Sequence, residues 1–268
     1  MPKIKIRGSE FFYEEKNPGR KQTILLIHGH PFNHTMWKYQ YNALSGFHLV
    51  LPDLKGYGKS DYRFDKIYIE EQAMDLAILL DALGVEGVHL IGLSMGAQIA
   101  LEFSRLFPHR TKSLVFCDST PAGENEESHK ARLSLADRIQ HIGMKAYTEQ
   151  DIHKYLHPET LLQKCETCEH LNEMMVSTHV DGAVASHKGR AERRDGMVFL
   201  PLIRFPVLFI VGDRDFFTPP QEMLTNAKRI QGCRFEIIEG AGHMPNMEQP
   251  DKFNEIILDF YNGFVPVK

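Results

Sequence analysis

Residues 88–106 read Val-His-Leu-Ile-Gly-Leu-Ser-Met-Gly-Ala-Gln-Ile-Ala-Leu-Glu-Phe-Ser-Arg-Leu, and this stretch decides the fold. A short apolar run leads into Gly92-Leu93-Ser94-Met95-Gly96, and an apolar helical pattern begins directly afterwards. The pattern predicts a buried strand, a tight turn that carries Ser94, and a helix. Glycine at positions 92 and 96 fits this prediction, because a side chain there would collide with the turn or with the packed helix.

Ser94 is a candidate nucleophile, because such a turn projects the serine hydroxyl above the sheet. The helix that begins beside Ser94 directs its free N–H groups and its positive end toward the same place, which would stabilise an oxyanion. A strand-to-helix connection without chemistry is the alternative interpretation, since Gly-x-Ser-x-Gly also occurs by chance.

Further apolar runs and helical patterns lie on both sides of this stretch. An edge hairpin is predicted around Gly8, followed by buried strands of a parallel sheet at residues 23–27 and 207–211 and by further strands at residues 47–51, 113–117 and 235–238. Helices are predicted at residues 69–83 and 251–261. Residues 119–199 contain charged, helix-period segments without a strand. We therefore predict an α/β core domain from residues 1–118 and 200–268, with a helical cap (lid) inserted as residues 119–199.

Polar residues follow three of these strands, in the order serine, aspartate, histidine. The carboxyl ends of parallel strands lie on one side of the sheet, where ligands bind, so these side chains are expected to meet. Serine needs a base to act as a nucleophile, and the base needs a carboxylate to orient it. His243, between glycines, is the predicted base, and Asp215 is the preferred acid, with Asp118 and Asp213 as alternatives.

The segment after the strand at residues 23–27 reads His28-Gly29-His30-Pro31-Phe32. Gly29 lets the backbone turn close to a ligand, and Pro31 has no N–H group to donate. The amide of His30 is therefore the predicted oxyanion donor of this loop, with Phe32 as a substitute. We interpret His28 as a residue that braces the loop and His34 as a surface residue.

Residues 53–60 approach the pattern of a phosphate-binding loop, but Asp53 stands where that loop requires glycine. Its carboxylate would repel a phosphate, so a glycine-rich turn held by Asp53 is the favoured interpretation. Side chains of the insertion could in principle bind zinc, but their spacing matches no known pattern, and we favour solvated helix residues: His153, His157, Cys165, Cys168 and His170. No cofactor and no metal are predicted.

Composition narrows the function classes further. The chain has 268 residues, a net charge of −4 and no basic patch, so a nucleic-acid partner is not expected. No run approaches the roughly 18 apolar residues of a membrane span. The charged first ten residues and the four cysteines predict a cytoplasmic protein with free thiols and a small-molecule partner.

Five motifs together resemble the α/β-hydrolase superfamily over nearly the whole chain: His28-Gly29, Asp53-x-x-Gly56-x-Gly58-x-Ser60, Gly92-x-Ser94-x-Gly96, Gly212-x-x-Asp215 and Gly242-His243. The resemblance implies an eight-stranded, mostly parallel sheet with the cap after the sixth strand. It also implies a triad of Ser94, Asp215 and His243, with the backbone N–H groups of His30 and Met95 as oxyanion donors. Residues 28–37 and 200–220 are similar to the branch of small esterases, enol-lactonases and cofactor-free haloperoxidases.

This resemblance predicts a serine hydrolase that cleaves a small, largely apolar ester or lactone through an acyl-enzyme on Ser94. Methionines of the insertion fit an apolar pocket and fit a helix core equally well: Met174, Met175 and Met197. A carbon–carbon bond hydrolase is one alternative, and Arg190, Arg193 and Arg194 are candidates to bind the acid end of its substrate. A ligand receptor with little turnover is another. The oligomeric state is left open.

Overall fold

A single mostly parallel sheet forms the centre of the protein. The computed structural model describes residues 3–163 and 165–264, and within them eight strands pair in the order β1-β2-β4-β3-β5-β6-β7-β8. The strands are β1 (Lys3–Ile6), β2 (Ser9–Lys16), β3 (Thr23–Ile27), β4 (His48–Pro52), β5 (Val88–Leu93), β6 (Thr111–Cys117), β7 (Val207–Gly212) and β8 (Arg234–Ile238). The pairs β1–β2 and β2–β4 are antiparallel, and the other pairs are parallel. The predicted eight-stranded, mostly parallel sheet is confirmed.

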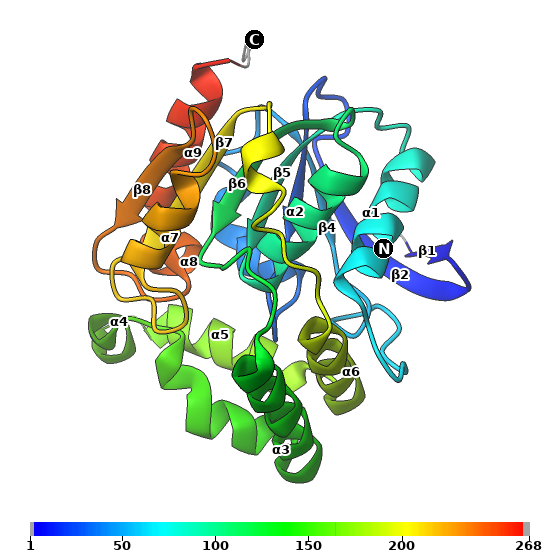
Figure 1. Cartoon of the computed structure of the whole chain (residues 1–268), viewed down its shortest axis with the longest axis vertical. Coiled ribbons are helices and arrows are strands. Elements are labelled where there is room, and N and C mark those ends of the chain that lie inside the picture. Colours follow the sequence, from blue (N-terminus) through cyan, green and yellow to red (C-terminus); the bar gives the residue numbers. More distant parts are fainter. Residues whose placement is uncertain (1–2, 164, 265–268) are drawn as a thin grey trace.

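Helices cover both faces of the sheet, which explains the unbroken apolar strands. All five residues of β3 are buried, and successive side chains join opposite cores. One core contains α1 (Ile69–Ala82), α2 (Met95–Leu106) and α7 (Pro220–Ala227). The other contains η1 (His34–Gln40), α8 (Pro245–Glu248) and α9 (Pro250–Asn262). Figure 1 shows α9 and α7 at one end of the sheet and the β1–β2 hairpin at the other.

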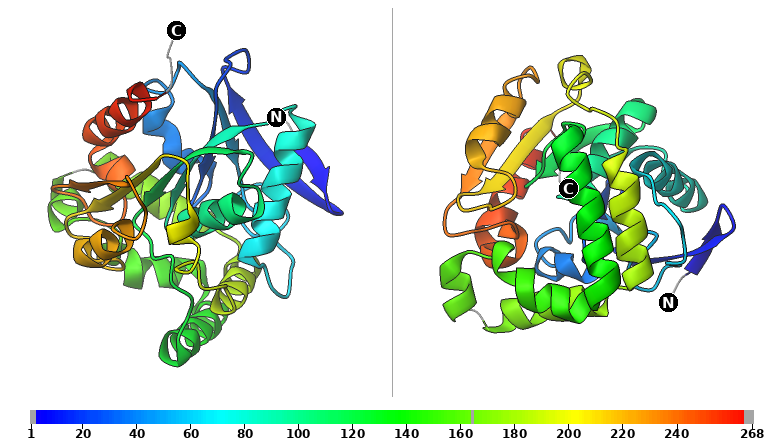
Figure 2. Two further views of the ribbon diagram at one scale, coloured as in Figure 1. Left: turned by 45° about the horizontal axis from the view of Figure 1, so that its top comes forward. Right: turned by 60° about the horizontal axis from the view of Figure 1, so that its bottom comes forward.

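The segment between β6 and β7 is helical, as its periodicity predicts. It contains α3 (Glu126–Asp151), η2 (Ile152–Lys154), α4 (Pro158–Gln163), α5 (Cys165–Ser177), α6 (Val180–Ala191) and η3 (Leu200–Leu202). α3 bends at Gly143, whose φ of 75° interrupts the helix, and it packs against α6. α3, α4, α5 and α6 lie together below the sheet in the view of Figure 1, and the right panel of Figure 2 shows the same group from another side, whereas Leu200 of η3 packs in the core with α1 and α2. Their assignment to a separate cap domain stays a prediction.

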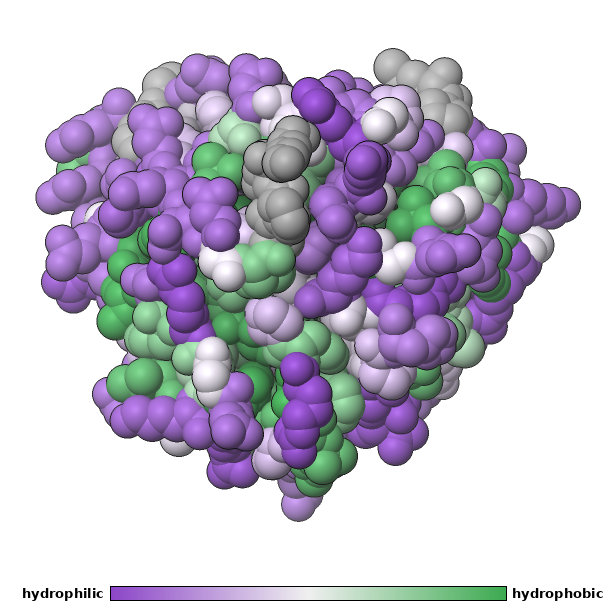
Figure 3. All heavy atoms as spheres, turned by 90° about the horizontal axis from the view of Figure 1, so that it is seen from above, coloured by the Kyte–Doolittle hydropathy of each residue, from purple (hydrophilic) through white to green (hydrophobic). Residues whose placement is uncertain are grey.

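Three short helices were not predicted from the sequence: η1, α7 and α8. α7 and α8 begin at Pro220 and Pro245, and proline fits the first turn of a helix. η1 buries Met36 and Trp37 against the sheet. On the side opposite α3–α6, hydrophilic side chains predominate around scattered hydrophobic ones (Figure 3).

Candidate active site

Ser94 occupies the tight turn between β5 and α2. Its backbone has φ 56° and ψ −119°, in a region that non-glycine residues rarely adopt. A Cβ atom on Gly96 would lie 2.1 Å from the carbonyl oxygen of Ile27, and one on Gly92 would lie 2.3 Å from that of Gly96. The predicted need for glycine on both sides of Ser94 is therefore met by close approach of the backbones.

His243 and Asp215 form a buried hydrogen-bonded pair. His243 follows β8, Asp215 follows β7, and the His243 Nδ1 atom lies 2.9 Å from Asp215 Oδ1. The same oxygen accepts a hydrogen bond of 2.8 Å from the Phe217 amide, so two donors orient it. The His243 amide also donates to the carbonyl of Tyr155, which follows η2. The helices between β6 and β7 thus contact the histidine loop directly.

Ser94 and His243 line one cavity of about 320 Å³ at the carboxyl ends of the strands. The structure therefore brings together the serine and the histidine that the sequence analysis selected, with Asp215 bonded to the histidine. Of the alternative acids, Asp213 Oδ1 accepts a hydrogen bond from the Ala241 amide. Asp118 Oδ1 accepts one from the Gly212 amide. Neither has a hydrogen bond to His243 among the described residues.

Two backbone amides adjoin Ser94 from different elements. Met95 is the first residue of α2, so its N–H group has no acceptor within the helix. His30 follows β3 and lines the cavity, and no hydrogen bond from its amide occurs among the described residues. The Phe32 amide instead donates to the carbonyl of Gly29 at 3.1 Å. Phe32, the substitute donor, is thus already engaged, whereas the His30 amide is not.

The imidazole of His30 is part of a buried polar network. Its Nδ1 lies 2.8 Å from the Tyr57 hydroxyl, and its Nε2 lies 3.0 Å from Nε2 of His187 in α6. Burial, reinforced by Arg190, lowers the pKa of His30 well below its usual range. Burial and the neighbouring His30 do the same to the pKa of His187. Both rings are therefore neutral at pH 7, and together they link the β3 loop to α6.

The cavity is lined by apolar side chains, such as Leu135 and Phe217, and by polar and cationic ones, but not by the three methionines. Met174 and Met175 are buried in the core on one side of the sheet, and Met197 packs against the other core. The polar side chains that line the cavity include Gln98, Ser119, Arg132, Tyr147, Tyr155, His187 and Arg190. The helix-core interpretation of these methionines is therefore the one that the structure supports.

Arg190 is a buried guanidinium without a carboxylate partner among the described ion pairs. Its Nε donates to Gln98 Oε1 at 3.3 Å. Arg132 lines the same cavity and donates to Glu124 at 2.6 Å, while Arg193 also donates to Glu124. Burial lowers the pKa of Arg190 to about 9, and Arg132 adds repulsion. Glu124 thus pairs with Arg132 and with Arg193, whereas the Arg190 guanidinium has no carboxylate partner among the described ion pairs.

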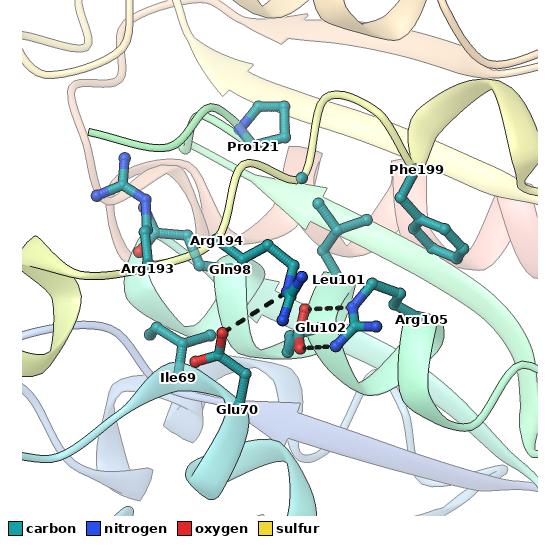
Figure 4. Close-up of a pocket in the computed structure, with 11 residues that line it drawn as sticks. Ile69, Glu70, Gln98, Leu101, Glu102, Arg105, Pro121, Arg193, Arg194 and Phe199 are labelled. Carbon is teal, nitrogen blue, oxygen red and sulfur yellow. Dashed lines mark hydrogen bonds and ion pairs between the residues drawn. The ribbon is translucent and has the colours of Figure 1, made fainter. Parts of the chain in front are cut away.

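The three arginines that the sequence analysis named lie in two different hollows of the structure. Arg190 lines the cavity, and Arg193 and Arg194 line a small second hollow between α1, α2 and the segment before β7 (Figure 4). In that hollow Arg105 pairs with Glu102, and Arg194 lies 3.9 Å from Glu70. Arg194 is more than half exposed. Arg105 and Arg194 pair with carboxylates of this hollow and Arg193 pairs with Glu124, whereas Arg190 has no carboxylate partner among the described ion pairs. Arg132 was missed, because nothing in its local sequence distinguishes it from other basic residues of a long helix.

Two histidines near the site were interpreted from the sequence with different success. His28 is buried, accepts a hydrogen bond from the Leu54 amide and contacts the Gly29 carbonyl, as expected of a loop-bracing residue. His34 is not a surface residue. It is 6% exposed and lies 2.6 Å from the buried Asp53 carboxylate, which also accepts from the Lys59 amide. Asp53 thus holds the glycine-rich turn through Lys59, and its hydrogen bond to the His34 ring keeps that histidine in the interior.

The described histidines and cysteine in and near η2 and α5 do not converge. Among the described side chains, His153, His157, Cys168 and His170 form no group of three whose ligand atoms lie within reach of one another. Cys168 donates to the carbonyl of Thr160. The side chain of Cys165 lies outside the described part of the structure.

Residues 3–163 and 165–264 include no helix that is long and apolar enough to cross a bilayer.

A family model described as the alpha/beta hydrolase fold matches residues 22–250. A thermophilic esterase from Thermogutta terrifontis, determined with malate bound, is 32% identical with a TM-score of 0.94, and the match covers 98% of this chain and 99% of that one. A 3-oxoadipate enol-lactonase of Acinetobacter baylyi is 27% identical over 97% of this chain and 94% of the relative. A 2-hydroxy-6-oxo-6-phenylhexa-2,4-dienoate hydrolase of Comamonas testosteroni is 26% identical over 94% and 92%.

Proposed function

The chain belongs to the alpha/beta hydrolase fold family and is a hydrolase, and on this premise we propose that it cleaves a carboxylic ester or lactone through an acyl-enzyme on Ser94. The observation that supports this most strongly is the buried His243–Asp215 hydrogen bond of 2.9 Å beside the cavity that Ser94 lines. The esterase and enol-lactonase among the relatives act on the same type of bond. Residues 119–199 would form the cap over this cavity.

In this proposal His243 removes the proton of the Ser94 hydroxyl as its oxygen attacks the ester carbonyl. The carbonyl oxygen becomes an oxyanion, which accepts hydrogen bonds from the amides of His30 and Met95. His243 then gives the proton to the leaving alcohol, and the acyl group remains on Ser94. A water molecule, deprotonated by the same histidine, attacks the acyl carbon; the acid leaves as its bond to the Ser94 oxygen breaks, and His243 returns the proton to that oxygen. Asp215 keeps the histidine in the required tautomer throughout.

We further propose that the substrate carries a negatively charged group, such as a second carboxylate. Arg190 and Arg132 line the cavity, and a guanidinium binds a carboxylate through two parallel hydrogen bonds. The buried Arg190 has no carboxylate partner of its own among the described residues, so an anion from the substrate would supply it. The malate-bound state of the Thermogutta esterase is in keeping with this, because malate is a dicarboxylate. The charged group is added to the small ester or lactone that the sequence predicts, whose apolar part would contact side chains such as Leu135 and Phe217.

Two methyl esters of similar length test this function. The protein is expected to hydrolyse monomethyl succinate with a kcat/KM at least about tenfold above that of methyl pentanoate, since only the former has a carboxylate for the arginines. Arg190→Gln is expected to lower kcat/KM for monomethyl succinate about a hundredfold and that for methyl pentanoate less than about threefold. Methanol release gives both rates.

Arg194→Gln is the matched control, because the Arg194 side chain is mostly exposed and lies outside the cavity. It should leave the preference for the half-ester intact. An equal loss toward both esters in Arg190→Gln would refute the anion-binding role while leaving ester hydrolysis standing. Failure of the folded wild-type protein to hydrolyse either ester would refute ester hydrolysis itself.

Carbon–carbon bond hydrolysis is the second candidate, and the same arginines favour it. The dienoate hydrolase of Comamonas testosteroni acts on a substrate that its name identifies as an acid. Arg190 would bind such an acid end as well as it binds that of a half-ester. Comparison of kcat/KM for a 2-hydroxy-6-oxodienoate and for monomethyl succinate separates the two functions, and we expect the ester to be the better substrate.

A further inference from the structure

Two buried carboxyl groups meet next to His243, and each has one oxygen without a hydrogen-bond donor. Asp215 Oδ1 accepts from His243 and from the Phe217 amide, whereas Asp215 Oδ2 has no partner. Asp118 Oδ1 accepts from the Gly212 amide at 2.9 Å, whereas Asp118 Oδ2 has none. One atom each of Asp118, Asp215 and His243 lies within 4.8 Å of the others. Two ionised carboxylates at this separation would repel each other and leave both oxygens unsatisfied.

A single proton between the two free oxygens removes both problems. Asp215 receives two hydrogen bonds that favour its charged form, and Asp118 receives one. Asp118 is also fully buried, and burial, together with repulsion from Asp215, raises the pKa of Asp118 well above its usual range. These contacts favour Asp118 over Asp215 as the holder of a shared proton.

We propose that Asp118 is a protonated positioning residue whose carboxylic acid donates a hydrogen bond to Asp215 Oδ2. This inference rests on the triad of the proposed function. The hydrogen bond would fix the second oxygen of Asp215 and so hold its first oxygen toward His243. It would also leave one negative charge, not two, beside the base. The proton on Asp118 is not transferred during the reaction.

The other ionisable groups around Asp118 come from three elements. Glu248 of α8 and Asp215 both oppose a second charge on Asp118, and Cys117 precedes it on β6. Burial raises the pKa of the Cys117 thiol, so this group stays neutral. Glu248 accepts hydrogen bonds from the amides of Gly242 and His157. No cation faces the Asp118 carboxyl in the described ion pairs, so nothing there favours its ionised form.

Asp118→Asn and Asp118→Leu test the proposal against the alternative of an ionised Asp118. The asparagine amide can donate to Asp215 Oδ2, so kcat for monomethyl succinate is expected to fall only about threefold, with no shift of the acidic limb of the kcat/KM profile. Leucine supplies no donor, and kcat is expected to fall about ten- to a hundredfold with KM little changed.

An ionised Asp118 would give the opposite pH behaviour. Removing a charge within 4.8 Å of the His243 ring would move the acidic limb down by about two pH units in Asp118→Asn, because the base would bind its proton less tightly. Such a shift would overturn the proposal. Equal losses in the asparagine and leucine variants would overturn it as well, because they would indicate a role in packing alone.

Infrared spectroscopy gives a readout that does not depend on activity. The wild-type protein at pH 7 is expected to show the carbonyl stretch of a buried protonated carboxyl group, and Asp118→Asn is expected to lack it. Ser94→Ala should retain this band, because it removes the nucleophile and leaves both carboxyl groups in place. Absence of the band in wild-type protein would overturn the proposal about Asp118. Failure of the proposed ester hydrolysis would instead be seen as an absence of turnover, with the band unchanged.

Discussion

Replacing Ser94 by alanine is expected to lower kcat for monomethyl succinate by about 10⁴ to 10⁶, with little change in KM. The hydroxyl is the only part of the side chain that forms a bond to the substrate, so its loss removes the acyl-enzyme route altogether. The guanidinium groups of the cavity and the amides of His30 and Met95 remain, which is why binding should persist. Steady-state rates of methanol release, with thermal unfolding to verify the fold, measure the effect.

Ser119→Ala is the matched control for this loss. Ser119 is a second hydroxyl of the same cavity, and its Oγ donates to the Ser94 carbonyl oxygen at 2.8 Å. The Ser119 hydroxyl is oriented by this backbone contact and has no hydrogen bond to His243 among the described residues. Ser119→Ala should therefore lower kcat by less than about tenfold. If Ser119→Ala abolished turnover while Ser94→Ala retained it, the nucleophile would have been assigned to the wrong serine.

Asp215→Asn is expected to lower kcat by about 10⁴ with the structure intact. The carboxylate accepts from His243 Nδ1 at 2.9 Å and from the Phe217 amide at 2.8 Å. An amide in its place can turn its NH2 group toward the ring, which puts the proton on the other nitrogen and leaves no base facing Ser94. The kcat of the purified variant for monomethyl succinate, compared with wild type, tests this.

Asp213→Asn provides the comparison, since it makes the same chemical change two residues away. Asp213 is partly exposed and accepts from the Ala241 amide, so its loss should affect the loop slightly and kcat by less than about tenfold. A large effect at position 213 with a small one at position 215 would reverse the assignment of the acid.

Much of the sheet was predictable from the sequence because β3, β4 and β7 are nearly unbroken apolar runs, each followed by a polar residue. The same pattern brought Ser94, Asp215 and His243 to one side, since the ends of parallel strands share an edge. Strand ends alone admit Asp118 and Asp213 as well as Asp215, and the resemblance to the superfamily supported the preference for Asp215. The structure adds that both carboxyls are buried together.

Other features depend on packing that no local pattern reveals. Arg132 lies on α3 among other charged residues, and only the packing of α3 against α6 brings it to the cavity with Arg190. His34 is buried because Asp53, nineteen positions away, hydrogen-bonds to it. Met174 and Met175 are buried in the hydrophobic core. The cavity is lined by other residues of the same helical segment, such as Arg132 and Tyr147.

Labelling with a fluorophosphonate tests the central claim most directly, because this reagent forms a stable bond only with a serine that a neighbouring base has activated. The account predicts that activity falls in proportion to the phosphonyl group incorporated, up to one per chain, and that peptide mass spectrometry finds it on Ser94. Ser94→Ala should incorporate none. Complete inactivation with the label on another residue, or undiminished turnover of monomethyl succinate after full labelling of Ser94, would contradict the account.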